Sequence, residues 1–120
     1  MKNVFIELGG RRRELRFETW GIMQVEKELN LPIRKALEDE KVATVITLLW
    51  GSLLHRNKRL TLEQVASWVN IADGDAVKGL VEAVSSAFLL ANGIDPDELK
   101  AIDAEQEDLQ EKKTKTKKAG

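Results

Sequence analysis

Near its start the chain alternates between apolar and polar residues in two short runs that two glycines separate. The runs cover residues 4–8 and 13–17, on either side of Gly9-Gly10. Because adjacent glycines readily adopt the positive φ angles of a tight turn, we predict a β-hairpin in which Val4 faces Leu15. Opposed residues share a face, so one face of the hairpin is apolar and must pack on other elements; its members are Val4, Ile6, Leu8, Leu15 and Phe17.

From Thr19 onward the apolar residues recur every three or four positions, which indicates α-helices. Local signals mark their ends: Asn30 fits the left-handed residue that stops a helix, Pro32 opens the next one, and Thr61 begins a capping box with Gln64. We predict five helices in the body of the chain: one capped by Thr19 and ending near Leu29, a short one from Pro32, one at about 42–56, one after Thr61, and one from Asp73 or Asp75 to Asn92-Gly93.

The helix at 42–56 is apolar on nearly every side, so we expect it at the centre of the fold, with Trp50 as a core residue. The next two helices are expected to present one apolar face each. The inward-facing residues predicted for them are Leu62, Val65, Ala66 and Val69 in one, and Val77, Leu80, Val81, Val84 and Phe88 in the other.

These patterns predict a mainly α fold of the α+β class, a small bundle of about five helices with an N-terminal β-hairpin. The globular domain is expected to cover residues 1–94, and residues 95–120 form a charged extension. Of these, 95–111 hold eight acidic residues and one lysine, whereas 112–120 hold five lysines and no acid. Asp95-Pro96 predicts the start of an acidic helix. Because this segment has few apolar residues, we expect the helix to fray towards a flexible, partly disordered lysine tail.

The inventory of reactive side chains is short. The 120 residues include no cysteine, no tyrosine and one histidine, and no phosphate-binding loop, dinucleotide fingerprint or zinc-ligand spacing occurs. That histidine, His55, falls near a predicted helix end, where a basic side chain suits the helix dipole. The acidic runs at 38–40 and 73–75 fall at helix boundaries, where capping accounts for them. We therefore expect no catalytic residue, no metal site and no cofactor, and no membrane span either, because the apolar runs are too short.

A basic patch at the hairpin tip, Arg11-Arg12-Arg13 with Arg16, raises nucleic-acid binding as an alternative. Residues 1–94, however, hold thirteen basic and twelve acidic residues, which is not the charge footprint of a DNA-binding domain. The segment 57–68 has the length of a helix-turn-helix, but it presents no cation on its second helix to the edges of bases. We expect no nucleic-acid partner.

The helix at 19–29 has two apolar faces. One is a core stripe, and the other carries Trp20 and Met23 beside Lys27. Either the hairpin covers this second face or it forms a protein-binding patch, since aromatic residues and methionine are enriched in interfaces. Trp68, at the edge of its own helical stripe, poses the same question. The candidate protein-binding residues are therefore Trp20, Met23, Lys27 and Trp68.

Several segments, taken in order, resemble a known family. The Gly9-Gly10 turn is followed by the strand Leu15-Arg16-Phe17 and then by a helix that contains the sequence Val-Glu-Lys-Glu-Leu at 25–29. Further along, the apolar stretch 48–55 is followed by a polar loop and by the sequence Leu-Thr-Leu-Glu-Gln-Val at 60–65. This order resembles the tail assembly chaperones of long-tailed, siphovirus-like phages and prophages, over residues 3–92. The chain departs from the family mildly, with Asn30 where Gly is commoner and with a more basic hairpin tip.

The resemblance implies a non-catalytic chaperone in the cytoplasm of the host cell, absent from the mature virion. It implies two partners, the tape measure protein, which it keeps soluble, and the tail tube protein, whose polymerisation it assists; self-association stays open. Many such proteins are made in two lengths by a programmed ribosomal frameshift. The lysines of 112–118 fit adenine-rich slippery codons, although a solubilising tail explains them equally well. The alternative functions are a small adaptor that binds a helix in a groove and, behind it, a nucleic-acid-binding regulator.

Overall fold

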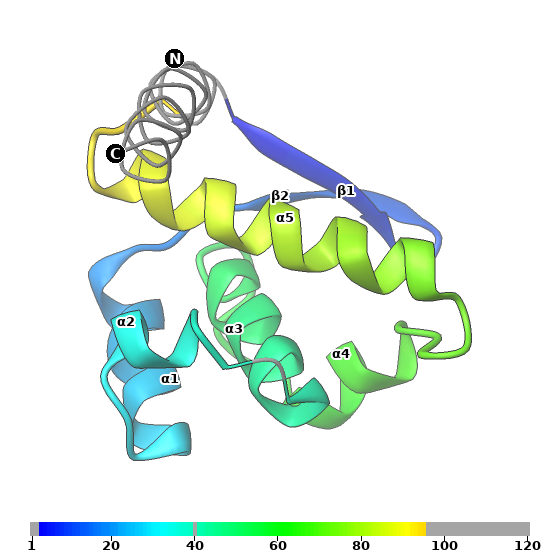
Figure 1. Cartoon of the computed structure of the whole chain (residues 1–120), viewed down its shortest axis with the longest axis horizontal. Coiled ribbons are helices and arrows are strands. Elements are labelled where there is room, and N and C mark those ends of the chain that lie inside the picture. Colours follow the sequence, from blue (N-terminus) through cyan, green and yellow to red (C-terminus); the bar gives the residue numbers. More distant parts are fainter. Residues whose placement is uncertain (1–2, 40, 96–120) are drawn as a thin grey trace, which may run out of the picture.

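The computed structural model describes residues 3–39 and 41–95, in which a β-hairpin is followed by five helices (Figure 1). This confirms the predicted mainly α fold with an N-terminal hairpin. The expected sixth helix from Pro96 and the lysine tip lie outside the described residues. The elements are β1 (Val4–Leu8), β2 (Arg11–Leu15), α1 (Thr19–Leu29), α2 (Ile33–Ala36), α3 (Val42–Leu53), α4 (Leu62–Ser67) and α5 (Gly74–Ala91).

The hairpin has the register that its two-glycine turn predicts. Gly9 and Gly10 have φ angles of 61° and 75°, and Val4 pairs with Leu15. The second strand covers Arg11–Leu15 rather than the predicted 13–17, because a two-residue turn starts the ladder directly after Gly10. Beyond Leu15 the backbone leaves β1, and the Arg16 amide donates instead to the Ser52 carbonyl of α3 at 2.9 Å.

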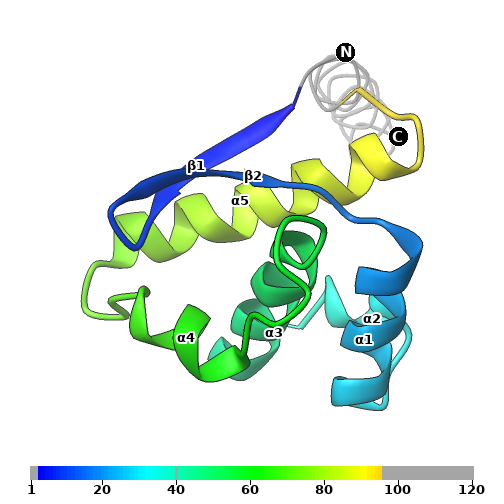
Figure 2. The same cartoon turned by 180° about the vertical axis from the view of Figure 1, so that it is seen from behind.

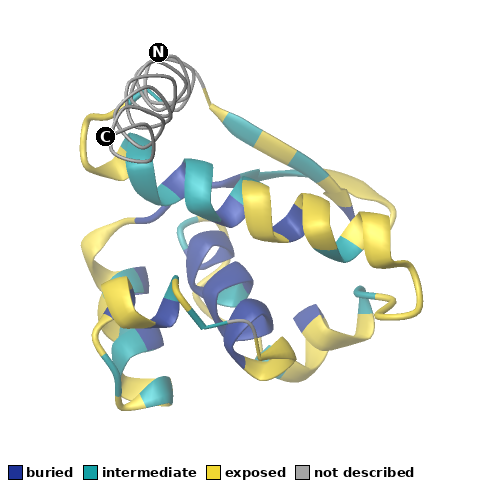
Figure 3. Ribbon diagram, viewed as in Figure 1, coloured by how far each residue is buried: buried dark blue, intermediate teal, exposed yellow. Residues whose placement is uncertain are grey.

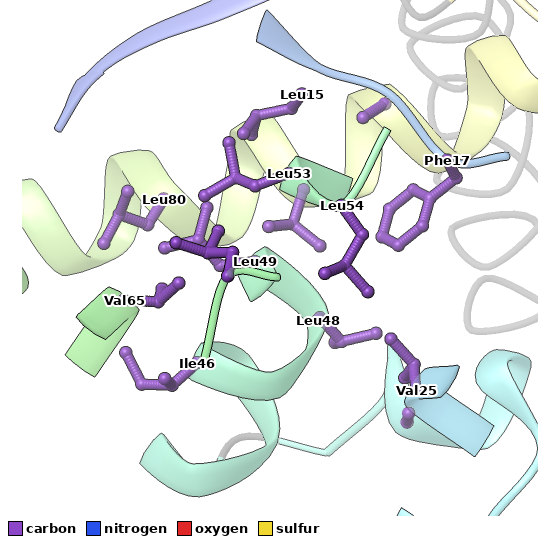
Figure 4. Close-up of a cluster of buried hydrophobic side chains, with 14 of the residues drawn as sticks. Leu15, Phe17, Val25, Ile46, Leu48, Leu49, Leu53, Leu54, Val65 and Leu80 are labelled. Carbon is purple, nitrogen blue, oxygen red and sulfur yellow. The ribbon is translucent and has the colours of Figure 1, made fainter. Parts of the chain in front are cut away.

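Helix α3 is the centre of the fold, as its all-round apolar pattern predicts. Nine of its twelve residues are buried, and it contacts α1, α4, α5 and β2 (Figure 3). The helix α5 crosses both strands of the hairpin, so the hairpin and α5 form a cover over one end of α3 (Figure 2). Leu49 and Leu54 of this region are fully buried among side chains from α1, α4, α5 and β2 (Figure 4).

Four of the predicted helix ends are present, among them the end of α5 at Ala91, directly before Asn92-Gly93. Asn30 is left-handed (φ 50°) and closes α1, the Thr61–Gln64 capping box begins α4, and the Asp73 side chain accepts from the Ala76 amide at the start of α5. Thr19 is not the cap of α1, since Glu18 holds that position without a side-chain hydrogen bond. Helix α3 ends at Leu53, earlier than predicted.

Two predicted core positions are wrong. Ala66 is exposed, because α4 is only six residues long and turns mainly Val65 inward. Val81 is 40% exposed, because the buried face of α5 runs through Leu80, Val84 and Ala87. Val81 lies beside that face and lines a groove described below.

Candidate functional site

The outer face of α1 is open. Trp20 is 42% and Met23 57% exposed, and Lys27, on the same face of the helix, is exposed too. The hairpin packs on α5 and α3 instead, so of the two alternatives the one in which it covers these side chains is excluded. From the loop after α3, the Lys58 ammonium lies 5.8 Å from the centre of the Trp20 ring. Three of the four sequence candidates therefore share one accessible surface, which we call the α1 face (Trp20, Met23, Lys27).

Trp68 belongs to another part of the molecule. Its half-buried ring lies against the hairpin turn, where a Cβ added to Gly9 would be 2.8 Å from ring atoms. The Arg13 guanidinium stacks 4.0 Å from the ring centre, and the Arg13 Nε donates to the Leu8 carbonyl at 2.8 Å. Trp68 therefore anchors the hairpin tip to α4 and is not part of the α1 face.

Two other residues of chemical interest have structural contacts. Trp50 is half-buried, and its Nε1 donates to the Leu60 carbonyl at 2.8 Å, which fastens the loop after α3 to that helix. His55 is half-buried, and its Nε2 is hydrogen-bonded at 2.9 Å to the carbonyl oxygen of Glu14 on β2. The sequence predicts His55 near a helix end but does not reveal this partner, because 41 residues separate the two positions.

Asp39 lies two residues before Lys41, the N-cap of α3, and its side chain bonds the start of this helix. Its carboxylate accepts from the Lys41 amide at 3.0 Å and from the Thr44 hydroxyl at 2.8 Å. The backbone hydrogen bond from Lys41, followed by that from Thr44, lowers the pKa of Asp39, because both stabilise the ionised form. Within 3–39 and 41–95, no cluster of three or more His, Cys, Asp or Glu side chains is arranged to hold a metal ion.

An apolar groove of about 370 Å³ opens between the α2–α3 connection and α5. Three of its residues are exposed large apolar side chains, with Ile71 66%, Val42 50% and Val81 40% exposed. No sequence pattern points to this groove, because Val42 and Val81 belong to regular helical stripes. We call it the apolar groove; it is lined by Leu37, Glu38, Asp39, Val42, Val45, Ile46, Val69, Ile71, Val77, Lys78, Leu80 and Val81.

A second groove, of about 430 Å³, lies between the turn end of the hairpin and the segment that runs from the end of α3 to α4. We call it the arginine groove, because four arginines line it beside a single acidic residue. Its members are Phe5, Arg11, Arg12, Arg13, Glu14, Leu53, Arg56, Asn57, Leu60, Gln64 and Trp68. The fold therefore unites the basic hairpin tip with Trp68, a combination that is not visible in the linear sequence.

Comparisons with protein-family models, with curated proteins and with solved structures give no match to this chain. In the part of the chain that the structure describes, the helices are too short or too polar to cross a membrane.

Proposed function

We propose that this protein is a non-catalytic tail assembly chaperone of a long-tailed phage or prophage, acting in the host cytoplasm. Its clients would be the tape measure protein, which it binds, and the tail tube protein, whose polymerisation it assists. The proposal rests on the resemblance of residues 3–92 and on one structural observation, the exposure of Trp20 and Met23 together on the α1 face. Exposed tryptophan and methionine side chains are typical of surfaces that bind apolar segments of other proteins.

The side of α1 opposite to the α1 face packs against the core, which holds the exposed side chains of this face in place. Gly21 and Val25 of the same helix are buried against α3. Helix α1 therefore presents Trp20 and Met23 from a helix that is already packed on the core, and a client would not have to order this helix on binding.

The test is co-purification of the chain with the tape measure protein of the same phage or prophage. Trp20→Ala with Met23→Ala is expected to abolish co-purification while leaving the melting temperature nearly unchanged. The matched control is Phe5→Ala with Ile94→Ala, which truncates apolar side chains of similar exposure (44% and 41%) elsewhere on the surface. The proposal fails if both double variants retain the client, or if the first one loses on the order of the 3–5 kcal/mol that truncating a large buried side chain costs.

The apolar groove favours a second function, a small adaptor that binds a helix of a partner protein. An apolar groove with exposed valine and isoleucine is suited to the nonpolar face of an amphipathic helix. Ile71→Asp with Val81→Asp separates the two functions. Binding that survives this change but is lost in the Trp20 and Met23 variant assigns the client to the α1 face, and the reverse result assigns it to the apolar groove.

A further inference from the structure

The arginine groove holds positive charge that the described part of the chain leaves largely unpaired. Arg56 Nη2 lies 4.0 Å from Glu14 Oε1, and both residues line the groove. Within residues 3–39 and 41–95, neither Arg11 nor Arg12 forms an ion pair, although both are exposed at the hairpin tip and Glu7 is the cross-strand neighbour of Arg12. Four arginines against one glutamate in its lining give this groove a positive charge that would attract an anionic ligand.

Two of the guanidinium groups are already held in place. Arg13 is stacked on Trp68 and hydrogen-bonded through Nε, while the guanidinium of Arg12 lies 4.3 Å from the centre of the Phe5 ring. Stacking restrains the plane of a guanidinium and leaves its edge open. The terminal N–H groups at that edge match the two oxygens of a carboxylate. The groove is therefore preorganised for carboxylates, and little side-chain entropy is lost on binding.

The same chain carries a complementary segment. Residues 97–111 contain seven acidic residues and one lysine, whereas the arginine groove has the opposite balance. We propose that segment 97–111 binds in the arginine groove of its own chain through its carboxylates. Because the segment is tethered, its effective concentration at the groove is on the order of millimolar, so weak exposed ion pairs suffice.

The chain is long enough for this contact. Helix α5 starts beside the turn end of the hairpin and ends far from that turn, as Figures 1 and 2 both show. Its 18 residues carry the chain about 27 Å at 1.5 Å per residue. Fifteen residues span up to about 50 Å when extended at 3.3–3.6 Å each, which covers the way back to the groove.

An acidic segment bound in the arginine groove would compete with any other anionic ligand for the same arginine side chains. The arginine edges that bind carboxylates are the same donors that would bind the phosphates of a nucleic acid. The proposal therefore predicts that, in the full chain, the arginines of the hairpin tip bind nucleic acid less well than they would without the acidic segment. It does not depend on the identity of any client protein.

The test is paramagnetic relaxation enhancement in the full-length chain. Because the sequence has no cysteine, Gln106→Cys gives a single site for a nitroxide label inside the acidic segment. The expected result is loss of amide peak intensity at Arg11–Glu14 and of the Trp68 indole peak. This loss should largely disappear when ionic strength rises from about 0.1 M to about 1 M, because the Debye length falls from about 10 Å to about 3 Å.

Two variants and one mixture make the result decisive. Arg11→Gln with Arg12→Gln should remove the broadening, whereas Arg34→Gln with Lys35→Gln, two exposed cations on α2, should leave it unchanged. Unlabelled ¹⁵N protein mixed with labelled ¹⁴N protein should show no broadening. The proposal is overturned if the hairpin tip is not broadened, if broadening is insensitive to the Arg11 and Arg12 changes, or if it persists in the mixture, which would assign the groove to a second copy.

Discussion

Gly21 of α1 and Gly51 of α3 face each other where the two helices cross, and neither position has room for a side chain. A Cβ added to Gly21 would lie 2.5 Å from the Gly51 carbonyl oxygen, and one added to Gly51 would collide with Val25 Cγ2. This close approach lets the buried side of α1 pack directly on the central helix. It also sets which side of α1, the one with Trp20 and Met23, is turned outward.

Gly51→Ala is therefore expected to destabilise the protein. Overpacking at a tight site usually costs about 1–3 kcal/mol, so chemical denaturation should show a loss in that range. The matched control is Gly79→Ala in α5, where nothing lies within 4 Å of an added Cβ. That change should raise stability by about 0.5–1 kcal/mol, because alanine favours helix over glycine. If Gly51→Ala proves as stable as the control, the close crossing of α1 and α3 is wrong.

Asp39 predicts a specific pH dependence of stability. Because folding lowers the pKa of Asp39 below its ordinary value of 3.8, its contribution is complete above that value and is lost as pH falls through the lower folded-state pKa. Asp39→Ala should thus lower the melting temperature at neutral pH, and its difference from wild type should shrink in acid. Glu38→Ala, a change at the exposed neighbouring acid, is the control and should have a small effect. A difference that stays constant down to strongly acidic pH would contradict a stabilising role of the ionised Asp39 carboxylate at the start of α3.

Nucleic-acid binding is expected to be absent from the full chain. Non-specific DNA-binding proteins bind at about 1–100 μM at physiological salt and more tightly at low salt, so an electrophoretic shift with generic duplex should detect them. We expect no shift at micromolar protein. A clear shift that weakens steeply with added salt would instead support the regulator alternative, and would point to Arg11, Arg12, Arg13 and Arg16.

Deleting residues 95–120 should leave the fold of the remaining chain intact. The core cluster of the described residues runs from Leu8 to Ala87, and exposed ion pairs contribute about 0–1 kcal/mol each. The expected change in melting temperature is therefore a few degrees, by the usual scaling of stability with Tm. Unfolding of the truncated chain would show that apolar residues beyond 94, such as Leu99 and Ile102, belong to the core.

If the truncated chain folds but tail assembly fails in a complementation assay, the extension is functional. Synonymous recoding of Lys112 and Lys113 then separates two causes. Recoding preserves the protein and destroys only a slippery site, so failure of the recoded gene indicates a frameshift. Full function of the recoded gene assigns the requirement to the charged segment itself.

The amino-acid sequence by itself determined the local features of this protein. The turn at Gly9-Gly10 and the register of the hairpin follow from two glycines, and Asn30, the Thr61 capping box and Asp73 mark helix ends through hydrogen bonds within a few residues. The central place of α3 follows from its apolar residues on all sides. Each of these signals is short in range, so neighbouring residues suffice to read it.

Only the tertiary structure decided which surfaces the molecule presents. Whether Trp20 was covered depended on where the hairpin packs, and the close helix crossing at Gly21 and the stacking of Arg13 on Trp68 join residues far apart in the chain. Val81, which has the periodicity of a core residue, became the wall of a groove for the same reason. Periodicity tells which face of a helix is apolar, but burial depends on which other elements pack against that face.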